Sequence, residues 1–133
     1  MVRVGRKLLL FGGWDGTRDL GDLWEWDLAR TREEEADGRS SCWRLLDDGS
    51  AEERRKPRAR SCHQLAVDES TGWVYLLGGM EEGSESATTN GSAPVGRRTD
   101  APDFWRYKAV GTGKGTWELL SENTEADGGP KLM

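Results

Sequence analysis

The sequence predicts an all-β protein made of short antiparallel strands. Seven tryptophans occur within 133 residues, and several of them recur at matching places in two similar halves of the chain. Each apolar run is short and ends at glycine or polar turn residues, and no run has the length and period of a long helix. Repeated units of four short strands are typical of β-propeller blades, and a closed ring needs ~4 to 8 of them. We therefore expect a propeller fragment of about two four-stranded antiparallel blades, not a closed ring.

Three segments of the first half are matched, in the same order, by three segments of the second half. Matched positions are 66, 81 and 74 residues apart, because the loops between strands absorb insertions while the strands keep their pattern. The pairs are LLLFGG (8–13) with VYLLGG (74–79), DLWEWDL (22–28) with DFWRYKA (103–109), and CWRLL (42–46) with TWELL (116–120).

The matched segments have the pattern of strands. Trp24, Trp26 and Leu28 alternate with smaller or charged residues, so a strand here would place three large side chains on one face. Residues 61–67 and 73–77 flank the turn residues 68–72 and predict a hairpin. The second unit thus has strands at 60–67, 73–79, 103–109 and 116–120.

These strands divide the chain into one partial and one complete blade. The first unit has no recognisable first strand before Leu8, so we expect it to supply only strands 2 to 4. The expected parts are a partial blade at 1–46, an inter-blade loop at 47–59, a complete blade at 60–120 with an inserted loop at 80–102, and an inter-blade loop with the start of a next blade at 121–133.

Composition argues against several classes of function. A net charge of −5 is unsuited to binding along nucleic-acid phosphates. The one basic run, at 54–60, is preceded by Glu52 and Glu53, and we interpret it as a solvated loop between strands. No apolar run approaches the ~18 residues of a membrane span. Cys42 and Cys62 are too few for a disulfide framework, so we expect free thiols and a cytoplasmic protein, with the nucleus as a second compartment.

The repeat resembles the kelch motif, in which a glycine pair ends the second strand and two aromatics pack between neighbouring blades. Trp26 stands where that motif more often has tyrosine, and the exchange keeps a large aromatic body. The residues that carry the resemblance are Gly12, Gly13, Trp26, Trp43, Arg60, His63, Gly78, Gly79, Tyr107 and Trp117. The resemblance implies structural roles for them.

Longer strings are similar to the muskelin family of kelch proteins: FGGWDGTRDLGDLW (11–24), PRARSCH (57–63) and WELLSENTEADGGPK (117–131). This resemblance implies a non-enzymatic scaffold within a multisubunit RING-type ubiquitin ligase. Its partners would be ligase subunits or substrates, together with the missing blades of its own propeller. Two alternatives stay open, a general kelch adaptor for the cytoskeleton and a fragment of a kelch-propeller oxidase or sugar isomerase whose site residues lie elsewhere.

The chain offers little catalytic chemistry. His63 is its one histidine, whereas a copper or zinc site would need two or three imidazoles. For the same reason, no second histidine is present to activate a serine elsewhere in the chain. GTGKG at 111–115 lacks the spacing of a phosphate-binding loop and precedes a strand. We therefore expect no catalytic residue, no metal site and no cofactor.

Loops offer the better candidates for partner binding. Strand direction places the loops 14–21, 47–59 and 80–102 on one face, and binding residues tend to lie on loops held by a rigid scaffold. Trp14 lies in the turn Gly-Gly-Trp-Asp-Gly and supplies the kind of side chain that anchors interfaces. The candidate binding residues are Trp14, Asp15 and Arg18, and the alternative for Trp14 is that it folds back onto the neighbouring blade.

Overall fold

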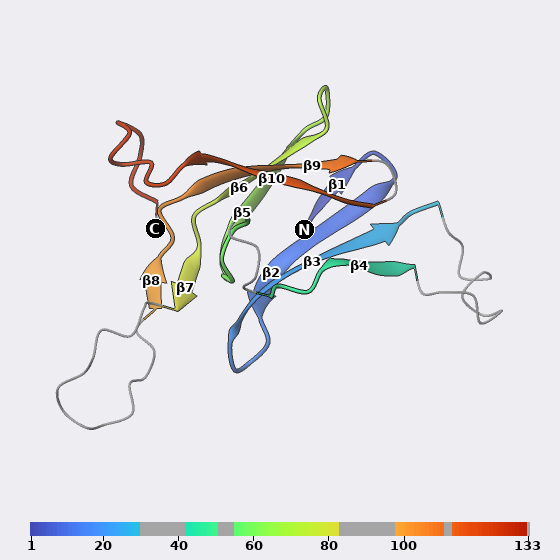
Figure 1. The fold of residues 1–133 in the computed structure, drawn as a ribbon, viewed down its shortest axis with the longest axis horizontal. Coiled ribbons are helices and arrows are strands. Elements are labelled where there is room, and N and C mark those ends of the chain that lie inside the picture. Colours follow the sequence, from blue (N-terminus) through green and yellow to red (C-terminus); the bar gives the residue numbers. More distant parts are fainter. Residues whose placement is uncertain (30–41, 51–54, 83–97, 111–112, 133) are drawn as a thin grey trace.

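The computed structural model describes residues 1–29, 42–50, 55–82, 98–110 and 113–132. These residues form ten strands and no helix, arranged in two four-stranded antiparallel sheets and a two-stranded ribbon (Figure 1). The prediction of an all-β, antiparallel fold is confirmed. Within this part of the chain, no helix has the length and apolar character to cross a membrane.

The first sheet has the strand order β1-β2-β3-β4. Its strands are β1 (Val2–Val4), β2 (Lys7–Trp14), β3 (Asp19–Asp27) and β4 (Trp43–Asp47). The pairing Leu8↔Trp26 and Trp26↔Trp43 aligns the matched apolar and aromatic segments across three strands.

The expectation that the first unit lacks its first strand is wrong. Strand β1 pairs with β2 through Val2↔Leu9 and Val4↔Lys7. Only Gly5 and Arg6 connect the two strands, and Gly5 has φ +58°, a left-handed conformation that favours glycine in such a tight turn. A three-residue strand before a two-residue turn is too short to give a clear period in the sequence.

The second sheet has the order β10-β9-β6-β5, which is the predicted sequence of strands in the complete unit. Its strands are β5 (Gln64–Asp68), β6 (Trp73–Leu77), β9 (Phe104–Val110) and β10 (Gly113–Ser121). The residues that precede β5, from Arg60 to His63, lie outside the strand, although 60–67 was the expected range.

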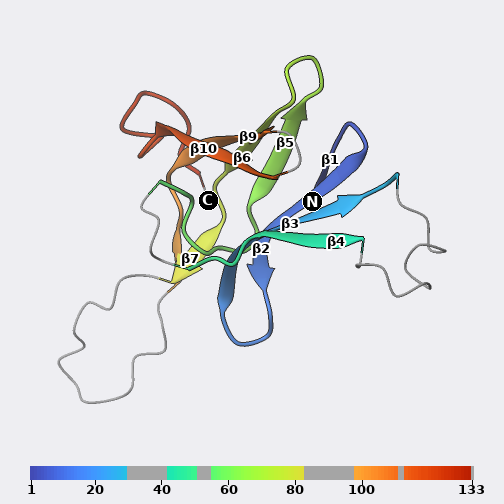
Figure 2. The ribbon, with the colours of Figure 1, turned by 45° about the vertical axis from the view of Figure 1, so that its right-hand side comes forward.

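The inserted segment 80–102 contains a small ribbon that the sequence did not predict. Strands β7 (Met80–Glu82) and β8 (Arg98–Asp100) pair with each other through Glu81↔Thr99. The β2–β3 turn and this ribbon lie toward one end of the molecule, and the β5–β6 turn lies at the other end (Figure 2). Residues 83–97 of the insertion lie outside the described residues.

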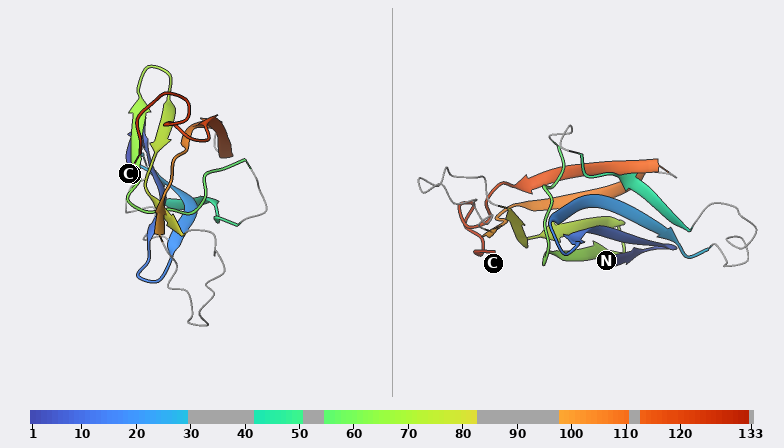
Figure 3. Two further views of the ribbon diagram at one scale, coloured as in Figure 1. Left: turned by 90° about the vertical axis from the view of Figure 1, so that its left-hand side faces the viewer. Right: turned by 90° about the horizontal axis from the view of Figure 1, so that it is seen from below.

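The core lies between the two sheets, whose strands run roughly along the long axis of the molecule (Figure 3, right). Leu9, Phe11 and Leu23 of the first sheet pack with the buried side chains of the second. The second sheet contributes Val74, Leu76, Trp105 and Tyr107.

The alternation along β3 places its aromatic face away from this core. Leu23 and Glu25 are buried, whereas Trp24 and Trp26 are only half-buried. Their counterparts in the second sheet, Trp105 and Tyr107, are buried against the first sheet. At the contact between the sheets, the first sheet therefore presents the face of β3 that carries Leu23, and the second presents the face of β9 that carries the aromatic residues.

Candidate functional site

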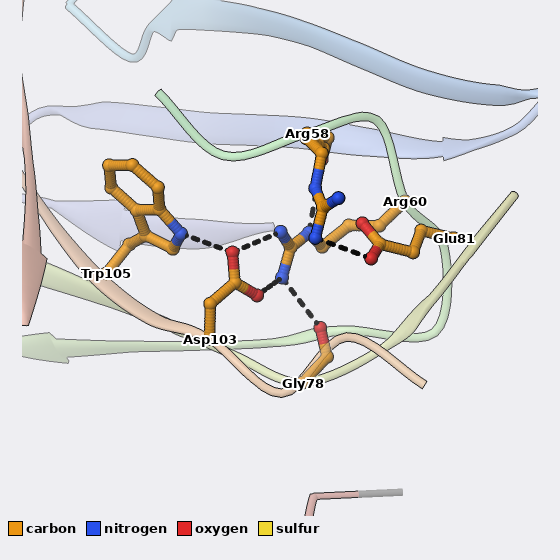
Figure 4. Close-up of polar contacts among 6 residues, drawn as sticks. All are labelled: Arg58, Arg60, Gly78, Glu81, Asp103 and Trp105. Carbon is orange, nitrogen blue, oxygen red and sulfur yellow. Dashed lines mark hydrogen bonds and ion pairs between the residues drawn. The ribbon is translucent and has the colours of Figure 1, made fainter. Parts of the chain in front are cut away.

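A buried arginine, Arg60, lies beside the end of β6 and the start of β9 (Figure 4). Arg60 is fully buried, and its two terminal nitrogens donate to the carboxylate of Asp103 over 2.7 and 2.9 Å. It also donates to the carbonyl oxygen of Gly78 at 3.2 Å, while the Trp105 indole donates to Asp103 at 2.6 Å. Burial by itself raises the pKa of Asp103, but these hydrogen bonds outweigh it and leave the pKa lowered.

A second ion pair lies beside the buried arginine. The carboxylate of Glu81, on β7, is 2.8 Å from the guanidinium of Arg58, whose side chain is largely exposed (Figure 4). Glu81 itself is buried, and burial raises its pKa despite the positive charges of Arg58 and Arg60. The pair thus connects the loop before β5 to the β7–β8 ribbon.

Trp14 joins the first sheet to the same ribbon. The guanidinium carbon of Arg98, on β8, lies 4.9 Å from the centre of the Trp14 ring, within the range of a cation–π contact. Arg98 also pairs with the buried carboxylate of Asp19 at 2.8 Å and donates a short hydrogen bond to the hydroxyl of Ser61. Trp14 is 48% exposed, so the arginine supports one side of the indole and leaves much of it open to solvent.

Asp15 and Arg18 shape the β2–β3 turn. The Asp15 carboxylate accepts hydrogen bonds from the backbone nitrogens of Thr17 and Arg18, both at 2.8 Å. The backbone hydrogen bond from Arg18, followed by that from Thr17, lowers the pKa of Asp15. The Arg18 side chain is exposed and stands 3.8 Å from Asp15. Asp15 therefore stabilises the turn, and Arg18 is the side chain available to a partner.

Parts of the three loops predicted to share a face do meet. Trp14 contacts Arg98, Arg58 contacts Glu81, and a Cβ added to Gly21 would lie 3.2 Å from the backbone of Ala59. We call the side chains here, the exposed Trp14, Arg18 and Arg58 and the half-buried Arg98, the Trp14 face. Residues 51–54 and 83–97 of the same loops lie outside the described residues.

The paired glycines adopt left-handed conformations in both sheets. Gly12 and Gly78 have φ +57° and +63°, and Gly13 and Gly79 have φ +114° and +97°. A Cβ on Gly12 would lie 2.7 Å from two backbone oxygens, and one on Gly79 would lie 2.7 Å from the Ser61 oxygen. Glycine is therefore needed here both for conformation and for close approach of the backbone.

His63 is half-buried and packs against the first sheet. Its ring makes an edge contact with Phe11, with ring centres 5.4 Å apart. Burial and then the charge of Arg60 lower its pKa from 6.5 to about 4, so the folded protein holds the imidazole neutral at pH 7. These surroundings are those of a packed side chain.

The aromatic pairs differ between the sheets. Tyr107 and Trp117 have ring centres 5.0 Å apart, and Trp117 also contacts Phe11 of the first sheet at 5.4 Å. Trp26 and Trp43 likewise lie 5.0 Å apart, but Trp43 is 37% exposed. The pair of the second sheet reaches the other sheet through the contact of Trp117 with Phe11.

Several residues of the network were missed at the level of sequence. They are Asp19, Glu81, Arg98 and Asp103. The repeat itself points to one of them, because Asp103 precedes Trp105 by two positions just as Asp22 precedes Trp24 in the first unit. Asp19 is the first residue of β3, and Glu81 and Arg98 lie in the three-residue strands β7 and β8, which are too short to show a periodic pattern.

The described residues hold no group of three or more histidine, cysteine or acidic side chains that could bind a metal. Cys42 is buried and Cys62 is exposed, and neither is in a disulfide. The chemistry of the site is therefore that of guanidinium groups, carboxylates and an indole.

Known proteins include several relatives of the chain. The chain is 31% identical over 126 residues to Mei4-dependent protein 6 of Schizosaccharomyces pombe, and the match covers 95% of this chain but 14% of that protein. It is 34% identical over 88 residues to N-(sulfonatooxy)prop-2-enimidothioate sulfolyase of Thlaspi arvense, covering 66% of this chain and 21% of that protein. No family model matches the sequence. The chain thus spans about a seventh to a fifth of the length of these relatives.

Proposed function

We propose that the chain forms two blades of a kelch-type β-propeller and acts as a non-enzymatic scaffold that binds a partner protein through the Trp14 face. The observation that carries the proposal is the half-exposed indole of Trp14 held against Arg98. Exposed tryptophan and arginine are the residue types most enriched at binding hot spots.

The arrangement of the loops supports this proposal. Arg98 is fixed by Asp19 and Ser61, so the indole has a preformed support on one side. A preorganised side chain loses less conformational entropy on binding than a mobile one. Arg18 and Arg58 provide exposed charge beside it, which favours a partner with an apolar anchor flanked by carboxylates.

Support for the kelch assignment comes from the repeat. Two four-stranded antiparallel sheets each carry a glycine pair at the end of the second strand, within β2 in the first sheet and directly after β6 in the second, and an aromatic pair across the third and fourth strands. Four-stranded sheets packed face to face are the units of a propeller. The resemblance to the muskelin family extends the proposal to a ubiquitin ligase subunit, and a cytoskeletal adaptor is the other scaffold function.

The proposal can be tested by affinity capture from cell extract with quantitative mass spectrometry. The full chain would be compared with Trp14→Ala and with Trp73→Ala. Trp73 is a matched control because the guanidinium carbon of Arg106 lies 3.9 Å from the centre of its ring. It is the first residue of β6, directly after the β5–β6 turn at the opposite end of the molecule. We expect specific partners to be lost with Trp14→Ala and kept with Trp73→Ala.

The captured partner would then be purified and its dissociation constant measured with each variant. A loss of at least ~30-fold with Trp14→Ala is expected for a hot-spot residue. Loss with Trp73→Ala alone would place binding at the other end of the molecule and contradict the proposal.

The name of the Thlaspi arvense relative favours a second candidate, part of an enzyme that acts on a sulfated thioimidate. The guanidinium groups of Arg58 and Arg98 could hold a sulfonatooxy group. Sulfate release from N-(sulfonatooxy)prop-2-enimidothioate by the full chain, compared with Arg98→Met and Arg106→Met, would test it. A rate above that of buffer, reduced only by Arg98→Met, is the result that would favour the enzyme.

A further inference from the structure

Glu25 is a buried carboxylate with two cations on one of its oxygens. Its side chain is 6% exposed, and Oε1 lies 3.0 Å from the Lys7 ammonium of β2 and 3.0 Å from the Arg44 guanidinium of β4. A buried ion is tolerated when an opposite charge lies beside it, and one cation is enough for that balance. The second cation therefore leaves an excess of positive charge at this place.

Asp47, at the end of β4, repeats this arrangement. Its side chain is 3% exposed and lies 2.7 Å from the ammonium of Lys56 and 3.0 Å from that of Lys114, on β10. Burial by itself raises the pKa of Asp47, but hydrogen bonds from Lys56, the Gly49 nitrogen and Lys114 outweigh it and leave the pKa lowered. Asp47 is therefore ionised at neutral pH, and again two cations share one negative charge.

Both groups of charges lie near the hydroxyl of Tyr107, on the second sheet. Burial raises the pKa of this hydroxyl, which accepts a hydrogen bond from the Gly115 nitrogen at 2.7 Å. Among the charges around it, Glu25 raises the pKa further, whereas Lys114 and Arg44 lower it. The outer strands β4 and β10 also contact each other. We call the four cations at this junction, Lys7, Arg44, Lys56 and Lys114, the β4–β10 surface.

The cations of this surface are more exposed than its carboxylates. The side chains of Arg44, Lys114 and Lys7 are 46%, 36% and 28% exposed, whereas the two carboxylates are buried. With the exposed Asp48, which follows in the chain, four cations stand beside three carboxylates, although the whole chain has a net charge of −5. A partner that approaches this junction therefore meets positive charge.

A cavity of about 320 Å³ lies beside two of these cations, Lys56 and Lys114. Leu45 and Leu46 contribute its apolar lining, and Leu45 is 45% exposed. An apolar side chain of a partner that entered this cavity would remove apolar surface from water, which is favourable. The junction thus offers an apolar contact next to positive charge.

We propose that the β4–β10 surface binds an extended acidic segment of a partner protein, with an apolar side chain over Leu45 and carboxylates on Arg44 and Lys114. Arg44 contacts Glu25 through a single terminal nitrogen, and a guanidinium has further N–H donors that a second carboxylate can use. This inference concerns a second surface and does not depend on the proposed function.

A protein segment is favoured over a nucleic acid or a free phosphate. The exposed cations are few for a polyanion that binds through many phosphate contacts, and the net charge of −5 opposes its approach. A phosphate ion would make no use of the cavity lined by Leu45 and Leu46. The occupant that fits therefore combines carboxylates with an apolar side chain.

The test uses a synthetic acidic peptide as the probe. The peptide EELDE, blocked at both ends and labelled with fluorescein, would be titrated with the full chain at low salt and followed by fluorescence anisotropy. The neutral peptide QQLNQ, labelled in the same way, is its control. We expect saturable binding of EELDE, at least ~10-fold weaker binding of QQLNQ, and a loss of affinity for EELDE as salt is raised, because salt screens exposed charges.

Variants of the chain locate the binding. Arg44→Gln and Lys114→Gln should each weaken the binding of EELDE at least ~5-fold. Both variants should fold, because each buried carboxylate keeps its other cation, and thermal melting checks this. Arg106→Gln is the matched control, since Arg106 pairs with Glu118 and follows Tyr107 on the opposite face of β9, and it should leave binding unchanged.

Four results would overturn the proposal. They are no binding at millimolar EELDE, equal binding of EELDE and QQLNQ, an equal loss of affinity with Arg106→Gln, and tighter binding of tripolyphosphate than of EELDE in a competition experiment. The last would mean that the surface prefers phosphate to a protein segment. The comparison of the two peptides uses the unaltered chain, so it remains decisive whatever the stability of the variants.

Discussion

Arg60 and Asp103 form an ion pair with two hydrogen bonds between residues 43 positions apart, and Arg60 has no exposed surface. The pair connects the segment before β5 to the start of β9, and its third contact reaches the end of β6 at Gly78. It thereby fixes three strands of the second sheet relative to one another.

Asp103→Asn should destabilise the protein strongly. The variant leaves the Arg60 charge buried without its carboxylate, and breaking a buried pair on one side costs roughly 3 to 5 kcal/mol. Urea denaturation of the full chain measures the loss. Glu118→Gln is the matched control, because Glu118 pairs with Arg106 at an exposed site, and its effect should be far smaller. Equal losses in the two variants would mean that Asp103 contributes no more than a surface charge.

Stability should fall between pH 6.5 and about pH 4 partly through His63. The folded protein lowers the pKa of His63 to about 4 by burial, so the unfolded chain binds more protons across this range. The contribution is complete above pH 6.5 and is lost as the pH falls toward 4. The free energy of unfolding should therefore decrease less over this range for His63→Gln than for the wild type. Parallel decreases would show that His63 is not held neutral.

Gly79→Ala should be more destabilising than Gly13→Ala, although both glycines have positive φ. Either change forces a non-glycine residue into a left-handed conformation, which costs about 1 to 2 kcal/mol. At Gly79 the new Cβ would also lie 2.7 Å from the Ser61 oxygen, whereas nothing lies within 4 Å at Gly13. Thermal melting compares the two variants, and a Gly13→Ala protein that melts lower would contradict the packing around Gly79.

Trp117→Ala should cost more stability than Trp43→Ala. Trp117 packs on Tyr107 and on Phe11 of the other sheet, and truncation of a buried tryptophan costs roughly 3 to 5 kcal/mol, which is an upper bound for this half-buried ring. Trp43 is 37% exposed and contacts Trp26 on its own sheet. Chemical denaturation would show the order, and the reverse order would mean that the contact between the sheets is not centred on Trp117.

Much of the fold could be predicted because strand patterns are local. Trp24 and Trp26 alternate with Leu23 and Glu25, and alternation of this kind follows from the geometry of a single strand. The repeat then supplied the strand order of the second sheet. The short β1 escaped prediction because three residues before a tight turn do not establish a period.

The candidate site was predicted only in part. Trp14 could be recognised as a large side chain in a glycine-rich turn, but its support, Arg98, lies in a ribbon formed by the two ends of a long insertion. Which of many loop arginines would reach Trp14 depends on the pairing of β7 with β8. No local pattern encodes that pairing.

The amino-acid sequence by itself determined the all-β class, the internal repeat and the glycine pairs, because these depend on side-chain alternation and on backbone conformations within a few residues. Only the tertiary structure decided that Arg60 binds Asp103 and that Trp14 rests on Arg98. Contacts of this kind join residues far apart in the chain, and their existence depends on how two complete sheets and their loops pack together.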